Sequence, residues 1–158
     1  MILYHGSYIA IPLPSLEFAR NTTDFGKGFY TTSIQLQADK WAERHRRRKG
    51  SGIVSIFEIN IDELKKNAST LEFDSYSMKW LDYILNCRQG LSTDTYDLVT
   101  GGIANDDVFN TLTLFFRGFI DKAEAIKRLR HEKPNIQYCF KTQNIIDKYL
   151  IYKGNKTI

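Results

Sequence analysis

The sequence predicts a single α+β domain that spans residues 1–158. The length is that of one ordinary domain. With 42% hydrophobic and 25% charged residues, the composition is that of a globular chain that buries most of its unfolded surface. Strand-like segments are interrupted irregularly by helical ones, and this order favours α+β over a doubly wound parallel sheet.

The first half of the chain predicts three strands and one helix. Their expected ranges are strands at residues 2–5, 29–32 and 53–61 and a helix at residues 34–48. The first strand stops at Gly6, a turn signal, and the second is rich in the β-branched and aromatic residues that strands favour. Apolar positions at helical spacing follow Ser33, which we expect to cap the helix. The third strand has the strongest pattern, so we expect it at the centre of the sheet.

The second half predicts shorter elements with recognisable caps. The expected ranges are strands at residues 71–73, 97–100, 136–141 and 150–152, helices at 77–89, 105–117 and 121–130, and short helical turns after residues 62 and 142. Asp121 and Glu124 approximate a capping box, in which each residue satisfies a free backbone N–H of the first turn. Pro134 ends the last of these helices.

Cysteine usage, hydropathy and charge narrow the function classes. Cys87 and Cys139 lack the close spacing of a zinc or redox motif, so we expect two reduced, buried thiols and no metal. The start of the chain lacks a secretory pattern, and no apolar run approaches ~18 residues, so we expect a cytoplasmic protein with no membrane partner. The net charge of +4 is local, because five cations fall between residues 44 and 49.

Two motifs carry the strongest functional signal. Tyr4-His-Gly-Ser7 places a histidine at a strand end beside a glycine, where backbone can approach a flat ligand. Residues 24–32 read Asp-Phe-Gly-Lys-Gly-Phe-Tyr-Thr-Thr, and because these glycines lead into a strand they are no phosphate cradle, which needs a helix start. In this order the two motifs resemble the ADP-ribosyltransferase superfamily of the diphtheria-toxin and poly(ADP-ribose) polymerase type. The wider pattern looks like a bacterial branch of that superfamily with an unassigned, toxin-type function.

The resemblance implies a fold and a set of NAD contacts. We expect split antiparallel sheets that meet at a cleft, with helices packed outside them. By resemblance, His5 hydrogen-bonds a ribose hydroxyl of NAD, the backbone of Gly6 pairs with the nicotinamide amide, and Tyr30 forms the nicotinamide pocket. Trp41, eleven residues further on, matches an aromatic that stacks on the nicotinamide ring. The motif residues that complete the predicted NAD site are Ser7, Lys27, Gly28 and Thr31.

The third family position departs from the pattern. Where the polymerases and diphtheria-type toxins have a catalytic glutamate on a late strand, this chain has Gln137. An amide can bond ribose hydroxyls but carries no charge to stabilise a developing cation, so a single transfer is favoured over chain elongation. Asp106 and Asp107 are candidates for a missing carboxylate, although acidic residues are also favoured in the first turn of a helix for its dipole.

The resemblance implies an NAD-dependent mono-ADP-ribosyltransferase that acts on a protein or nucleic-acid acceptor, with a toxin-type role and a neutralising antitoxin as a candidate partner. The alternative is a catalytically silent module that binds NAD, a nucleotide or nucleic acid. Two interpretations of the basic run at residues 44–49 stay open. It is either a solvated helix end or a footprint for a phosphate backbone, which gains affinity by releasing counterions.

Overall fold

The computed structural model describes residues 1–103, 106–130 and 135–158, apart from the side chains of residues 106 and 107. Within these residues, strands and helices interleave irregularly, and the predicted α+β class is confirmed. The strands are β1 (Ile2–Ser7), β2 (Phe29–Thr32), β3 (Ile53–Glu58), β4 (Thr70–Glu72), β5 (Leu98–Gly102), β6 (Ile136–Phe140) and β7 (Ile151–Thr157).

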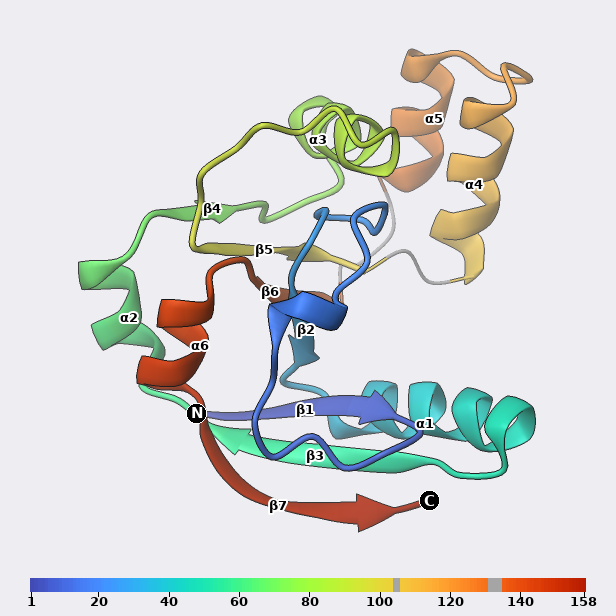
Figure 1. The fold of residues 1–158 in the computed structure, drawn as a ribbon. Helices are drawn as coiled ribbons and strands as arrows, with labels where there is room; N and C mark the ends of the chain where they lie inside the picture. Colours follow the sequence, from blue (N-terminus) through green and yellow to red (C-terminus); the bar gives the residue numbers. More distant parts are fainter. Residues whose placement is uncertain (104–105, 131–134) are drawn as a thin grey trace.

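These strands form one seven-stranded sheet in the order β4-β5-β6-β2-β1-β3-β7, antiparallel except where β4 pairs with β5. The expectation of two separate sheets is therefore wrong. The sheet is nonetheless narrowly joined at its middle, because the ladder between β1 and β2 holds only the pair Tyr4 and Thr32, whereas β1 pairs with β3 along its whole length. Figure 1 shows the two parts, with β1, β3 and β7 together and β2 leading from them toward β6 and β5.

The helices and one 3-10 turn pack around this sheet. They are η1 (Leu16–Phe18), α1 (Gln35–Lys49), α2 (Ile61–Asn67), α3 (Met78–Arg88), α4 (Asp106–Phe116), α5 (Lys122–Leu129) and α6 (Gln143–Tyr149). Helix α1 packs across β1, β2 and β3, and it runs along β1 in Figure 1. Helices α3, α4 and α5 gather at the β4–β5 end of the molecule.

The core divides between the two faces of the sheet. On one face, Val99 and Cys139 pack under α3, α4 and α5, and Val54 packs separately under α1. On the other face, Leu98 and Phe140 pack under α2 and α6. Successive residues of β5 and β6 thus serve opposite cores, as the two-residue repeat of a strand requires. The first face carries two groups of helices, and β2 runs between them.

Several predicted ends and caps need correction. The strand expected at residues 53–61 ends at Glu58, and Asn60 rather than Asp62 caps α2. This strand is not central, because β7 covers its outer edge and leaves it next to last in the sheet. At the start of α1, the backbone N–H of Ile34 bonds Thr32 Oγ1 at 3.1 Å, so Ser33 is not the cap. The capping residue Asp121 is confirmed.

Candidate functional site

The three residues predicted to act on NAD lie on three neighbouring strands. His5 is on β1, Tyr30 on β2 and Gln137 on β6, and β2 lies between the other two strands. Thr32 pairs with both Tyr4 and Gln137, so β2 connects the first motif to the late strand. Segments from the start, the first quarter and the end of the chain therefore meet at the narrow middle of the sheet.

The pairing register sorts the predicted residues between the two faces. Directly paired residues of an antiparallel ladder project to the same face, and alternate residues along a strand share a face. Because Thr32 pairs with Tyr4 and Gln137, these residues share a face with Tyr30 and Gly6. This is the face on which α1 packs. Four of the predicted positions are thereby brought to one side of the sheet once Trp41 on α1 is included.

The side chain of His5 alternates to the opposite face, where its ring lies 4.5 Å from that of Phe29. Its Nδ1 is 2.7 Å from the backbone oxygen of Tyr30, across the gap that opens beyond the last β1–β2 pair. Burial lowers the pKa of His5 from 6.5, against the raising effect of this hydrogen bond, so the ring is neutral at pH 7. A carbonyl only accepts, so Nδ1 carries the proton and Nε2 remains an acceptor.

Gly6 is required by the packing of α1. A Cβ at this position would lie 2.2 Å from the backbone oxygen of Ala38 and 3.0 Å from Cβ of Trp41. The absence of a side chain thus lets the helix backbone approach β1 and sets Trp41 beside the first motif. Trp41 itself is 47% exposed, and the guanidinium of Arg44 lies 4.8 Å from the centre of its ring.

The loop before β2 holds the ring of Tyr30 in place. The hydroxyl of Tyr30 donates to the backbone oxygen of Gly26 at 2.7 Å, accepts from the N–H of Phe25 at 2.9 Å and bonds Thr23 at 2.8 Å. Its ring stacks on Phe25 with 6.5 Å between centroids. Burial, with the nearby Cys139, raises the pKa of Tyr30 far above 10, so the phenol stays neutral. Tyr30 is a fixed wall and does not exchange a proton with a ligand.

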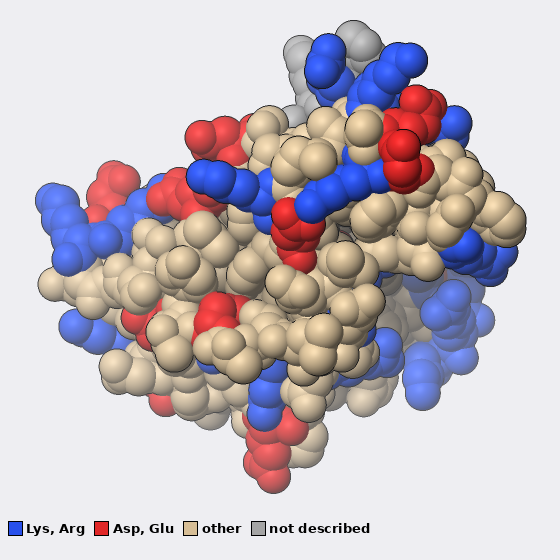
Figure 2. All heavy atoms as spheres, turned by 90° about the horizontal axis from the view of Figure 1, so that it is seen from above, with Lys and Arg blue, Asp and Glu red and all other residues tan. Residues whose placement is uncertain are grey.

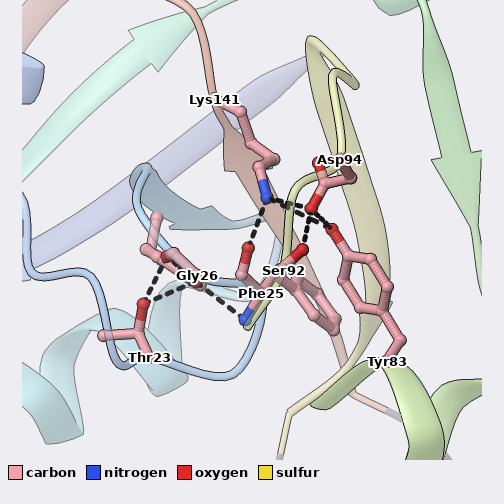
Figure 3. Close-up of polar contacts among 8 residues, drawn as sticks. Thr23, Phe25, Gly26, Tyr83, Ser92, Asp94 and Lys141 are labelled. Atoms are coloured by element: carbon pink, nitrogen blue, oxygen red, sulfur yellow. Dashed lines mark hydrogen bonds and ion pairs between the residues drawn. The ribbon is translucent and has the colours of Figure 1, made fainter. Parts of the chain in front are cut away.

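Lys141 holds the loop before β2 by a hydrogen bond to its backbone, as Figure 3 shows. Lys141 donates from Nζ to the backbone oxygen of Phe25 at 2.8 Å, to Asp94 at 2.9 Å and to Tyr83 at 3.2 Å. An ammonium has three N–H groups, and all three are used. Ser92 and Tyr83 also donate to the Oδ2 of Asp94. No sequence signal marks this network, since its members come from three separate segments.

Gln137 contrasts with that network. Its side chain is 8% exposed, and the buried Nε2 has no hydrogen-bond partner among the described residues. More than nine-tenths of buried polar groups in native structures are paired, so an unpaired amide donor indicates a missing acceptor. Its cross-strand neighbours are Thr32, whose hydroxyl bonds Gln37, and Gly101, which has no side chain. Two other buried donors, Nε1 of Trp80 and the hydroxyl of Tyr149, also lack a hydrogen-bond partner among the described residues.

The other predicted contacts have structural duties. Ser7 donates to the backbone oxygen two residues further on and closes the turn after β1. A Cβ on Gly28 would lie 2.3 Å from Sγ of Cys139, so β6 requires that glycine. Thr31 is buried on the face opposite Tyr30. Lys27 is exposed and is the one of these four with a side chain open to solvent.

The remaining expectations concern thiols, carboxylates and metals. Cys87 and Cys139 are free and buried as predicted, and burial raises the pKa of Cys139 to about 12, which keeps its thiol protonated. The side chains of Asp106 and Asp107 lie outside the described residues. Across the described part of the chain, no group of three His, Cys, Asp or Glu residues gathers as metal ligands would. Likewise, none of the helices described there has the length and apolar character to cross a bilayer.

The best-formed hollows of the described surface lie away from this site. One of about 340 Å³ lies between α3 and α4, and another of about 400 Å³ lies where β3 leads into α2. Neither is lined by His5, Tyr30 or Gln137. The site is thus marked by its exposed tryptophan and by a donor that is unpaired among the described residues.

Comparison with known proteins gives one match. The family described as "Protein of unknown function (DUF3990)" matches residues 1–152, nearly the whole chain. No curated protein and no solved structure matches this sequence. The match includes both N-terminal motifs, Gln137 and Lys141.

Proposed function

The chain belongs to the DUF3990 family of unknown function, and for this member we propose an NAD-dependent mono-ADP-ribosyltransferase activity. The observation that carries the proposal is the buried amide of Gln137, unpaired among the described residues and one strand away from Tyr30. Its position in the late strand is the one at which the resembling superfamily holds the nicotinamide ribose. The exposed tryptophan beside Gly6, on the same face of the sheet as Gln137, supports the same ligand.

The proposed reaction is attack at C1′ of the nicotinamide ribose. The bond from C1′ to the nicotinamide nitrogen breaks, and its electron pair leaves with neutral nicotinamide. A nucleophile of the acceptor forms the new bond to C1′ and loses its proton to solvent or to a base. Because nicotinamide is already a cationic leaving group in NAD, the protein needs to position the ribose and the acceptor more than to supply a strong acid.

Each residue has a distinct task in this scheme. Nε2 of Gln137 donates to a ribose hydroxyl. The neutral His5 lies on the opposite face of the sheet, and its Nδ1 bonds the backbone oxygen of Tyr30, so it positions β2 against β1. Trp41 supplies an exposed aromatic face beside Gly6, and the ring of Tyr30 forms a rigid wall. Lys27 and its exposed ammonium suit the pyrophosphate of an anionic substrate.

A single transfer fits the chemistry of Gln137 better than repeated transfer. An amide orients the ribose without the negative charge that stabilises an oxocarbenium-like transition state, so the expected rate is modest. One transfer per acceptor is sufficient to inactivate the target of a toxin. We also propose that a neutralising antitoxin binds this protein. The acceptor is a macromolecule, protein or nucleic acid.

The proposal is tested with NAD labelled in its adenylate half. The purified protein is incubated with labelled NAD and a crude lysate, and the labelled products are digested separately with protease and nuclease. We expect release of nicotinamide and a labelled macromolecule. Gln137→Glu supplies the missing charge and is expected to raise turnover, while Gln89→Glu, an exposed position at the end of α3, makes the same change without effect.

Two outcomes would contradict the proposal. The absence of nicotinamide release in both the parent and Gln137→Glu proteins would exclude a transferase. A rise in melting temperature with millimolar NAD but no turnover would instead support the silent binding module, since ligand binding stabilises the folded state by mass action.

A further inference from the structure

The basic run at the end of α1 divides into two sides with different surroundings. Arg46 and Arg47 bond the carboxylate of Glu43, from their Nε atoms at 2.8 and 3.2 Å. Arg48 and Lys49 lie at the same end of the helix, and both are exposed. The pairing with Glu43 offsets part of the charge on one side, so the basic character of α1 concentrates on the other.

That other side carries aromatic rings. This side of α1 carries four aromatic or basic residues at intervals of four, three and one positions: Trp41, His45, Arg48 and Lys49. Tyr8, from the loop after β1, is 44% exposed and lies 5.8 Å from Nζ of Lys49 and 6.0 Å from the ring of His45. We call this surface the Trp41–Lys49 stripe, composed of Tyr8, Trp41, Arg44, His45, Arg48 and Lys49.

This concentration of one sign is not general to the molecule. The face seen from above in Figure 2, over α3 and α5, intersperses acidic with basic side chains. On these two helices Lys122 pairs with Asp82, and Arg128 pairs with Glu124. In the Trp41–Lys49 stripe, Arg44 lies over the ring of Trp41, and Nζ of Lys49 lies 5.8 Å from the ring centre of Tyr8.

We propose that the Trp41–Lys49 stripe binds single-stranded nucleic acid. Cations that track a phosphate backbone and exposed aromatics on which bases stack are the two parts of a single-strand binding surface. A duplex would leave Tyr8 without base faces to stack on, because its bases are already stacked. The stripe begins at Trp41, whose Cβ approaches Gly6, so a bound strand reaches the proposed site. If the transferase proposal holds, on which this last step rests, the strand is the acceptor.

The test measures binding of a fluorescent oligo(dT) and oligo(U) of about 15 nucleotides by anisotropy, without NAD, at several salt concentrations. For single strands the log-log salt slope is about 0.7 per neutralised phosphate. We expect Arg48→Gln/Lys49→Gln to lower the slope by about 1.4 and to weaken binding at least tenfold. Arg46→Gln/Arg47→Gln removes the same charge from the same helix and is expected to change the slope much less. Tyr8→Ala should weaken binding about 5- to 100-fold through lost stacking.

The readouts separate this proposal from the transferase. Equal losses in the two double variants, or tighter binding of duplex or of anionic phosphatidylserine vesicles than of the oligonucleotides, would overturn the stripe as a single-strand site. Nicotinamide release without nucleic acid is measured in parallel and is expected to be unchanged in Arg48→Gln/Lys49→Gln. If the parent protein binds the oligonucleotides and never consumes NAD, the single-strand site is supported and the transferase proposal is wrong. If the parent protein consumes NAD and does not bind the oligonucleotides, only the single-strand site is wrong.

Discussion

Gln137 and Lys141 are four residues apart, one in β6 and one directly after it, and both are about nine-tenths buried. Lys141 is 10% exposed, and its three N–H groups have three protein partners. Gln137 is 8% exposed, and its Nε2 has none among the described residues. The difference teaches that burial alone does not distinguish a folding residue from a binding one. What separates these two residues is whether the described part of the protein pairs their buried N–H groups.

The largest loss of unfolding free energy is expected at Lys141, whose three N–H groups are all paired. Lys141→Met leaves Asp94 buried without its cation, and breaking one partner of a buried pair typically costs about 3–5 kcal/mol of unfolding free energy. Urea unfolding measures this loss, with Lys66→Met on the exposed side of α2 as the control. The double variant Lys141→Met/Asp94→Leu should recover part of the loss. A Lys141→Met protein as stable as the control would contradict this role of Lys141.

At Gln137 we expect a loss of activity without a loss of stability. Gln137→Leu keeps the approximate volume and removes the unpaired amide, so unfolding free energy should stay within about 1 kcal/mol of the parent or rise. Nicotinamide release should fall by one to two orders of magnitude, about 1.4–2.7 kcal/mol, within what one transition-state hydrogen bond contributes. Stability loss without activity loss would reverse the comparison and make Gln137 a structural residue.

Acid should affect the Lys141 network through Asp94. Burial raises the pKa of this carboxyl, but hydrogen bonds from Ser92, Lys141 and Tyr83 outweigh it, and the pKa lies below its usual 3.8. A depressed folded pKa contributes stability above pH 3.8 that is lost as the pH falls through the folded value. The stability difference between the parent and Asp94→Asn should therefore narrow in acid. Asp74→Asn, an exposed position, should show no such dependence on pH.

The smallest expected effect is a pH dependence of activity at His5. Nδ1 of this ring bonds the backbone oxygen of Tyr30, whereas Nε2 has no hydrogen bond among the described residues. Burial holds its pKa below 6.5, so the neutral ring persists above pH 6.5 and is lost only as the pH falls through the lower folded value. Nicotinamide release should thus be flat from pH 8 to 6.5 and decline in more acid solution. His5→Phe retains a ring beside Phe29 and should remove this acid limb together with much of the activity. An acid limb that persists in His5→Phe would assign it to another group.

Local patterns in the sequence were enough for most elements. The strand at Phe29–Thr32 has the predicted ends, because β-branched and aromatic residues there are followed directly by a helical repeat. Asp121 caps its helix as predicted, since a cap bonds a backbone N–H only three residues away. The predictions for Ser33 and for the far end of the 53–61 segment were wrong because adjacent residues in the chain, Thr32 and Asn60, bond the backbone N–H groups there.

The sequence by itself determined the α+β class, the two N-terminal motifs and the presence of an amide, Gln137, on a late strand. Only the tertiary structure decided how each polar group is used, because hydrogen bonds and close packing join residues that are distant in the chain. It showed that Gly6 accommodates α1, that Glu43 divides the basic run, and that, among the described residues, Lys141 is paired while Nε2 of Gln137 is not. A composition lists donors and acceptors, and a fold determines which of them are left for a ligand.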